Sequence, residues 1–385
     1  MLATLADLLA PVSLSEFLEG FRARTRLHIS ASDPTRAETL LSWQDIDTLL
    51  SRHGLDENVG IWRDSVPVPR QFYTSNEGKR LKVRAFHDLL AQGVSIVVDG
   101  VHRSIPQISQ LAAAVEREMG IRTQINAYLS FSKGGVFKPH WDILDILAVQ
   151  VHGRKRWRFW KAVVPHPVEY ADSVSIDASA VPDQEIELGP GDVLFIPRGE
   201  PHAAAVSAGY SVHLTIGLRS ETGINFLSYI HKKAAEDPLL RMNLPRQHSD
   251  AHEAALKRRL HQLIDDTSMS QFLQLGDLSR LPAVQTAVSG ALPQMNNVLR
   301  LSLRRRVPLP DVASGNGPQS VIIGGEARRL SLPAIDVLRW LFDHDPATSR
   351  ALYAELAPHH GHGSIDAALR ELLRFGFLVV NRGEG

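Results

Sequence analysis

The chain has 385 residues, which is enough to bury a large core and to form two or three domains. Lys and Arg together number 42, as do Asp and Glu, so the zero formal net charge indicates neither a nucleic-acid nor a membrane partner. The absence of cysteine excludes disulfides, thiol nucleophiles and cysteine-ligated metal sites. No apolar run approaches about 18 residues and no basic segment opens the chain, so we expect a cytoplasmic protein.

Residues 1–120 carry both helical and strand-like patterns. Ser13 and Glu16 have the spacing of a capping box, and the apolar residues that follow recur at helical intervals. A buried strand is predicted at Val94 to Val98, followed by an amphipathic helix over Ile105 to Met119. We expect these residues to form an α/β segment ahead of the β-rich part of the chain.

Residues 121–220 read as a series of short strands separated by turn residues. Ile143 to Val151 and Lys155 to Trp160 are predicted as two strands, with His152-Gly153 as the hairpin turn between them. The other predicted strands are Thr123 to Phe131, Glu185 to Leu188, Val193 to Ile196 and Tyr210 to Leu218. This pattern favours a mainly β core of the jelly-roll or double-stranded β-helix type.

Two short motifs in this region contain metal-ligand residue types. His140 and Asp142 are two residues apart, so on an extended strand both side chains point to the same face. His202 follows a short apolar strand and a bend that contains Pro and Gly. Two imidazoles and one carboxylate form the facial triad of non-haem Fe(II) oxygenases, which leaves positions open for a co-substrate and O₂. We therefore predict His140, Asp142 and His202 as catalytic metal ligands; the residues alone do not distinguish iron from manganese or nickel.

The downstream motif also carries a family resemblance. Pro-Gly-Asp-x4-Pro-x-Gly-x-x-His, ending at His202, resembles the second cupin motif. Together with His-x-Asp upstream it resembles the JmjC-type 2-oxoglutarate oxygenases, and it is similar to the bacterial ribosomal oxygenases over Asn126 to Arg219. The resemblance implies that residues 1–120 buttress a sheet of the β-helix. It also implies Fe(II), 2-oxoglutarate and O₂ as reactants, and hydroxylation of a protein or peptide side chain with succinate and CO₂ as co-products.

The resemblance further implies a cation for the distal carboxylate of 2-oxoglutarate. A Lys or Arg has this role in the JmjC-like oxygenases, and we assign it to Lys155, which shares an inward parity with Trp157 and Phe159. The alternative is an exposed lysine in an arginine-rich hairpin. Trp141, between the two upstream ligands, is expected to pack against the protein. Strand parity predicts Tyr128, Asn126 and Thr215 as co-substrate contacts and Ser211 and His213 as further pocket candidates.

The remainder of the chain is predicted to be mainly helical. Residues 221–310 carry amphipathic helices, which form a homodimer in the similar ribosomal oxygenases; plain intramolecular packing is the alternative. Residues 318–385 read as a strand, three helices and a strand, which resembles a winged helix. The third of these helices contains Asp366 and Glu371 beside its arginines, so we do not expect it to bind nucleic acid.

Three classes of function are compatible with these residues. The first is hydroxylation of a protein side chain, with a ribosomal protein as one candidate. The second is the same chemistry on a small molecule or a secondary-metabolite peptide, or in demethylation of a methylated target. The third is a non-catalytic cupin, which the complete ligand set and Lys155 disfavour. The sequence identifies neither the substrate nor the residue that is modified.

Overall fold

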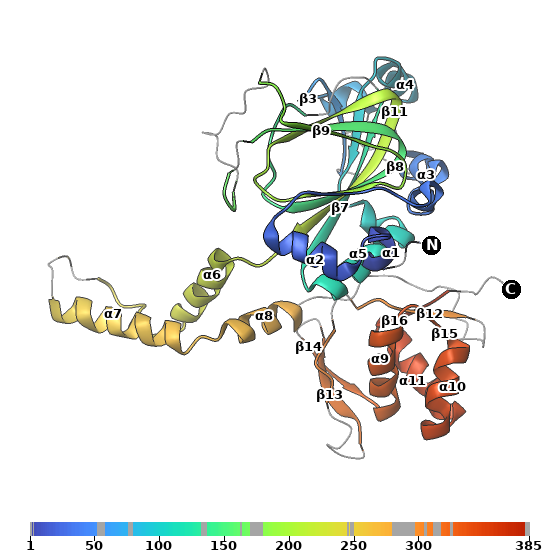
Figure 1. Ribbon diagram of the computed structural model, residues 1–385. Coiled ribbons are helices and arrows are strands. Elements are labelled where there is room, and N and C mark those ends of the chain that lie inside the picture. The colour runs from blue at the N-terminus through green and yellow to red at the C-terminus, as the bar shows by residue number, and fades with distance from the viewer. Residues whose placement is uncertain are drawn as a thin grey trace. The chain divides into compact units, whose positions relative to one another are not determined.

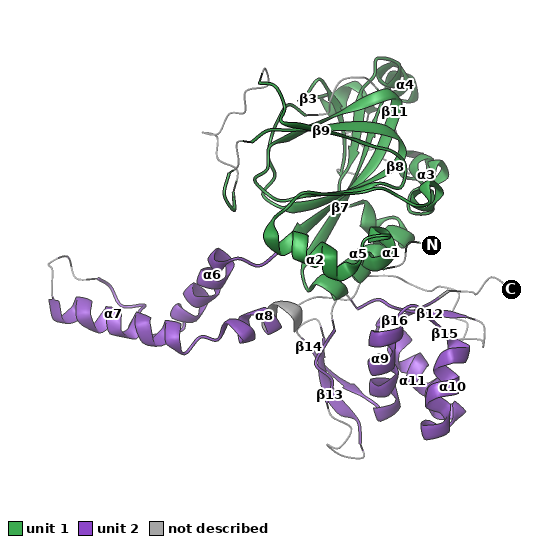
Figure 2. Cartoon of the chain, in the orientation of Figure 1, with its two compact units in different colours: residues 1–219 green, residues 220–385 purple. Residues whose placement is uncertain are grey.

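The computed structural model describes residues 2, 4–51, 58–75, 80–131, 137–161, 164–169, 180–244, 246, 250–278, 297–303, 306–310, 317–323 and 326–381. The chain divides into two compact units, residues 1–219 and 220–385 (Figure 2). Among the described residues, no helix combines the length and apolar character that a bilayer crossing requires.

A nine-stranded antiparallel sheet forms the centre of the first unit (Figure 1). In spatial order its strands are β1 (Leu27–Ile29), β10 (Val193–Ile196), β8 (Asp145–Phe159), β11 (His202–Arg219), β7 (Arg122–Ser130), β6 (Ser95–Val98), β2 (Val59–Arg63) and β3 (Val66–Pro67), with β9 (Gln184–Leu188) paired to β8. The long strands β8 and β11 stay paired from one end to the other, from Asp145 with Leu218 to Phe159 with His202. They bend along their length, so that β9 and β7 lie on opposite sides of a curled sheet (Figure 1).

The predicted hairpin at His152-Gly153 is wrong, because β8 runs through it without reversing. Gly153 has a φ of +66°, and the register between β8 and β11 shifts around it, between Val206 and Ala208, between Ala208 and Ser211 and between Val212 and His213. A glycine in the left-handed region next to a polar residue is typical of a tight turn, but it also supports a β-bulge. Here the bulge bends one continuous strand.

Two glycines at this bulge allow the bend to be tested. Gly153 and Gly209 both have a φ of +66°, but a Cβ atom at Gly153 would lie 2.0 Å from the Tyr210 carbonyl oxygen, whereas a Cβ at Gly209 would meet nothing within 4 Å. We expect Gly209→Ala to lower the free energy of unfolding by about 1 kcal/mol, the cost of the left-handed backbone. Gly153→Ala should lower it by about 1–3 kcal/mol more, because the strand must also move. Urea titration measures both, and equal losses would contradict the close approach.

Helices of the first unit cover the sheet and form its core with it. They are α1 (Leu5–Leu9), α2 (Leu14–Ala23), α3 (Trp43–Ser51), α4 (Val83–Ala91) and α5 (Pro106–Met119), with 3₁₀ turns at 34–39, 70–72 and 101–103 and a small β4–β5 pair (Thr74–Ser75 with Arg80–Leu81). As predicted, α2 begins after Ser13, whose hydroxyl accepts the Glu16 N–H. Its buried Phe17 meets Phe195 of β10 edge to face, with ring centroids 5.5 Å apart. The N-terminal segment therefore packs directly on the strand that leads towards His202.

The second unit begins with three helices, α6 (Gly223–Ala234), α7 (Asp250–Asp265) and α8 (Met269–Leu278). Its C-terminal part has three further helices, α9 (Leu332–His344), α10 (Ser349–His360) and α11 (His362–Arg374), with a three-stranded sheet of β15 (Ala347–Thr348), β12 (Val298–Leu301) and β16 (Leu378–Asn381), and a hairpin of β13 (Gln319–Ile323) and β14 (Glu326–Leu330). The predicted strand, three helices and closing strand are all present. β14 escaped prediction because four of its five residues are exposed and polar or small. The sequence also predicts a helix over Ala283 to Leu292, which lies outside the described residues.

Candidate active site

The three predicted metal ligands come from two segments that are joined by backbone hydrogen bonds. His140 and His202 exchange both of their backbone N–H groups and carbonyls, at 3.0 and 2.8 Å. Two residues on, the Asp142 carbonyl accepts the Gly199 N–H at 2.9 Å. His140 and Asp142 thus lie in an isolated bridge and a loop ahead of β8, and not on the regular strand that their spacing suggested.

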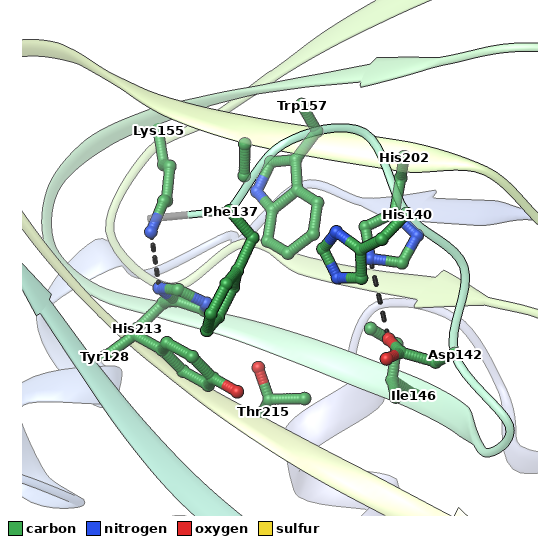
Figure 3. Close-up of a pocket in the computed structure, with 11 residues that line it drawn as sticks. Tyr128, Phe137, His140, Asp142, Ile146, Lys155, Trp157, His202, His213 and Thr215 are labelled. Carbon is green, nitrogen blue, oxygen red and sulfur yellow. Dashed lines mark hydrogen bonds and ion pairs between the residues drawn. The ribbon is translucent and has the colours of Figure 1, made fainter. Parts of the chain in front are cut away.

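The side chains of these residues converge on one point (Figure 3). One ligand atom from each lies within 4.8 Å of the others, and His202 Nε2 is 3.5 Å from Asp142 Oδ2. Each histidine donates its Nδ1–H to a backbone carbonyl two residues earlier, His140 to Lys138 at 2.8 Å and His202 to Glu200 at 2.9 Å. This tautomer leaves both Nε2 lone pairs free for a cation, and the hydrogen bonds fix the ring orientations as in established metal sites.

The electrostatic setting of His202 also suits a ligand. Its side chain is 4% exposed, and burial, reinforced by the neighbouring His140, lowers its pKa to about 4. The imidazole is therefore neutral near pH 7, as coordination requires. With the Asp142 carboxylate as a third ligand on one side, the donor set fits a divalent ion of the Fe(II) class with open positions.

A network around Asp145 holds the loop that carries His202. The buried Asp145 carboxylate accepts the Arg198 N–H at 2.9 Å and pairs with the Arg24 guanidinium at 3.1 Å. Arg24, at the end of α2, also donates to the Arg198 carbonyl at 2.9 Å. Gly199 completes the bend with a φ of +82°, where a Cβ atom would lie 1.9 Å from the Val164 carbonyl oxygen. Nothing in the sequence pointed to Arg24 or Asp145, since both act through contacts between distant segments.

A cavity of about 440 Å³, which includes its open mouth, extends from the metal ligands. Its lining is Tyr128, Phe137, His140, Asp142, Ile146, Lys155, Trp157, His202, Ala204, His213 and Thr215 (Figure 3). Lys155 is 1% exposed, and its Nζ lies 3.3 Å from His213 Nδ1 and 3.5 Å from Ser130 Oγ. No acidic group in the described part of the chain forms an ion pair with it, and burial lowers its pKa to about 7. A buried amine without an anionic partner is suited to receive one from a ligand.

The other residues predicted to contact the co-substrate divide into two groups. Tyr128, His213 and Thr215 line the cavity, and the Tyr128 ring stacks on His213 at 4.9 Å. Asn126 and Ser211 do not line it: the Asn126 side-chain oxygen accepts the Gly100 N–H at 2.9 Å, and the Ser211 hydroxyl accepts a hydrogen bond from the Gln150 amide at 2.9 Å. The alternation of side chains along a strand predicted the face on which these residues lie. It did not predict how far along the strand the cavity extends.

Four lining residues were not predicted as part of the site: Phe137, Ile146, Trp157 and Ala204. Trp157 shares the inward parity of Lys155 on β8, which is the signal that was available for it, whereas Ile146 lies an odd number of residues before Lys155 and parity gave no signal for it. Phe137 gave no signal, since it precedes His140 in a loop. The centroid of its ring lies 5.6 Å from that of the His140 ring and 5.1 Å from that of the Trp62 ring of β2, so Phe137 forms an aromatic side of the cavity. Trp141 is 5% exposed and packs inside the protein, as expected.

Comparison with known families identifies the segment that contains this site. The family model described as "JmjC domain" matches residues 101–226, a range that includes all three candidate ligands and Lys155. The chain therefore contains a segment of the JmjC-domain type.

Relatives of the JmjC-domain chain include named oxygenases. It is 26% identical over 358 residues to ribosomal oxygenase 2 of Rattus norvegicus, covering 82% of this chain and 75% of the relative. It is 26% identical over 218 residues to the bifunctional lysine-specific demethylase and histidyl-hydroxylase NO66 of Drosophila willistoni, covering 56% of this chain. That match spans 28% of the NO66 protein, so the similarity to NO66 is confined to part of that relative.

Solved structures share the fold of the JmjC-domain chain. The X-ray structure of E. coli YcfD superposes with a TM-score of 0.59 at 18% identity, covering 96% of this chain and 98% of YcfD. A structure of YcfD, described as a ribosomal oxygenase, in complex with cobalt and 2-oxoglutarate superposes with a TM-score of 0.56 at 18% identity and covers 96% and 99% of the two chains. The JmjC/cupin fold predicted from the motifs is thereby confirmed.

Proposed function

We propose that this JmjC-domain chain is an Fe(II)- and 2-oxoglutarate-dependent oxygenase that hydroxylates a side chain of a protein or peptide, with succinate and CO₂ as co-products. The observation that carries the proposal is one cavity with His140, Asp142 and His202 at one end and the buried Lys155 at the other. The relatives named ribosomal oxygenase and histidyl-hydroxylase support a protein substrate, and a cytoplasmic ribosomal protein is the leading candidate.

The residues divide the work between two ends of the cavity. His140, Asp142 and His202 would hold Fe(II), which when bound supplies the activation of O₂ that C–H hydroxylation requires. Lys155 binds the distal carboxylate of 2-oxoglutarate, and the hydroxyls of Tyr128 and Thr215 supply further donors. The aromatic rings around the cavity exclude water from the reacting groups.

Labelled oxygen tests this function directly. The protein is incubated with Fe(II), 2-oxoglutarate, ¹⁸O₂ and purified ribosomal proteins, and the proteins are then analysed by mass spectrometry. We expect one labelled oxygen to appear on a single side chain of one protein, with an equal amount of succinate, and neither product with Asp142→Ala. Loss of a methyl group would instead favour demethylation. Succinate released only with small molecules would contradict a protein substrate.

We also propose that α6, α7 and α8 form a homodimer interface and that the C-terminal part is a winged-helix-like module for protein contacts. The support for the interface is a set of exposed apolar side chains on and between these helices: Ile224, Leu227, Met242, Leu244, Leu260, Ile264, Met269 and Leu273. Apolar surface concentrated in one segment is typical of an association site. Light scattering during size-exclusion chromatography should give twice the 42.5 kDa chain mass, and a monomeric mass would contradict the interface.

A further inference from the structure

We infer that the indole N–H of Trp157 is an additional donor to the distal carboxylate of the co-substrate, beside Lys155. Trp157 is 3% exposed, lines the cavity, and its Nε1 has no hydrogen-bond partner among the described residues. Figure 3 shows the indole nitrogen on the side of the ring that faces Lys155. The inference rests on the proposed function, because it takes 2-oxoglutarate as the occupant of the cavity.

A bound molecule can supply the acceptor that this N–H lacks. Buried N–H groups almost always have an acceptor, since leaving one unpaired forfeits the hydrogen bond that it made to water. Around the Lys155 end of the cavity the ammonium can only donate, and the hydroxyls of Tyr128 and Thr215 can donate as well as accept. The carboxylate of the lining, Asp142, belongs to the metal-ligand group at the other end. The occupant of the Lys155 end should therefore be rich in acceptors, as a carboxylate is.

The hydrogen bonds of Lys155 leave room for a shared carboxylate. An ammonium has three N–H donors. His213 Nδ1 accepts one at 3.3 Å, because burial and the nearby Lys155 hold the pKa of His213 well below its ordinary value and keep the ring neutral. Ser130 Oγ lies 3.5 Å away and accepts a second, which leaves one N–H for the ligand. A carboxylate has two oxygens and about four acceptor positions, so it accommodates this donor and the Trp157 N–H together.

The position of Trp157 in the strand also indicates that its N–H lies at the Lys155 end of the cavity. It lies two residues after Lys155 on β8, on the same face, and its ring meets His213 edge-on at 5.5 Å. On the other side its ring lies 5.7 Å from that of His202. Trp157 thus spans the distance between the cation and the metal ligands, with its N–H towards the cation (Figure 3). We regard it as a co-substrate-binding residue that also sets the length of dicarboxylate that fits.

Trp157→Phe removes the N–H and keeps most of the ring. Trp160→Phe is the matched control, because the Trp160 indole is also buried but donates to the Ala180 carbonyl at 2.9 Å and does not line the cavity. Binding of 2-oxoglutarate is measured by calorimetry on the Mn(II)-loaded protein, which avoids turnover. We expect Trp157→Phe to weaken 2-oxoglutarate binding about 10-fold or more, as for a lost hydrogen bond to a charged group. Mn(II) affinity should be unchanged.

A second ligand separates the two ends of the cavity. 2-Oxobutyrate keeps the 2-oxo acid end but lacks the distal carboxylate, so Trp157→Phe and wild type should bind it equally. Equal 2-oxoglutarate affinity in Trp157→Phe and wild type would overturn the inference. So would an equal loss of affinity for 2-oxobutyrate, which would place the N–H at the metal end, or an equal effect of Trp160→Phe. If wild type itself binds no 2-oxoglutarate, the proposed function fails instead.

Discussion

Asp142→Ala should lower succinate formation by about 1,000-fold or more and abolish stoichiometric binding of Fe(II) or Mn(II). A bound metal ion supplies several kcal/mol of transition-state stabilisation, and each 1.36 kcal/mol is a tenfold change in rate. Asp142 is the carboxylate of a three-ligand set, so its loss removes both a ligand and the negative charge that offsets the cation. The two histidines alone would form a much weaker site.

The fold should survive this change. The Asp142 side chain is 26% exposed, so truncation leaves no closed void. The melting temperature of the metal-free variant should match that of the metal-free wild type. Asp183→Ala serves as the control, since Asp183 pairs with the exposed Lys161 at 3.6 Å on the surface and should change neither metal binding nor turnover. Metal bound at wild-type stoichiometry in Asp142→Ala would contradict the ligand assignment.

Lys155→Met should weaken 2-oxoglutarate binding by about 100-fold, because removing one partner of a buried charge pair costs several kcal/mol. Methionine has a similar length and fills the same space without the charge. Metal binding should be unchanged, which separates this end of the cavity from the ligand end. Calorimetry on the Mn(II)-loaded protein measures both. Wild-type affinity in Lys155→Met would exclude Lys155 as the site of the distal carboxylate.

The same lysine makes both stability and binding depend on pH. Burial lowers the pKa of Lys155 from 10.5 to about 7 in the ligand-free protein. Between these values the unfolded chain binds more protons than the folded chain, so the contribution of Lys155 to the free energy of unfolding rises with pH. 2-Oxoglutarate affinity should run the opposite way and fall above about pH 7, because the free amine must take up a proton to bind the dianion. Denaturation measures the free energy of unfolding, and calorimetry measures the 2-oxoglutarate affinity, both at about pH 6 to 9. Lys155→Met should show neither trend.

The convergence of His140, Asp142 and His202 was predictable because each of these residues lies in a local motif. His140 and Asp142 are two residues apart, and His202 ends a run of turn residues, so short-range spacing was sufficient. The hairpin error had the opposite origin: Gly153 favours a turn locally, and only its pairing with β11 keeps β8 continuous. The prediction that Asn126 contacts the co-substrate failed to match the cavity lining for a related reason. The alternation along a strand identifies the face of a residue, but the strand register decides how close that residue lies to the cavity.

The hydrogen-bond partners of the carboxylates on α11 could not be predicted from the sequence. The sequence predicts Asp366 and Glu371 as acidic groups on the surface of α11. In the structure the Asp366 carboxylate accepts the Tyr353 hydroxyl, and Glu371 accepts the N–H and hydroxyl of Ser331 at 3.1 and 2.6 Å. Both carboxylates are used inside the module, so they say little about its outer charge. The absence of nucleic-acid binding therefore stays a prediction.

The pairing of β1 with β10 and of β6 with β7 has a practical consequence for anyone who excises the JmjC domain by its family boundaries. β1 pairs with β10 through Leu27 and Phe195, and β6 pairs with β7 through Val98 and Ala127, yet both outer strands precede residue 101. A fragment limited to residues 101–226 would expose the strand edges of β10 and β7 and the apolar surface that α2 covers. Exposed strand edges and apolar surfaces promote aggregation. Arg24 would be missing as well, and with it the ion pair to Asp145. Soluble, metal-competent protein should require the preceding hundred residues.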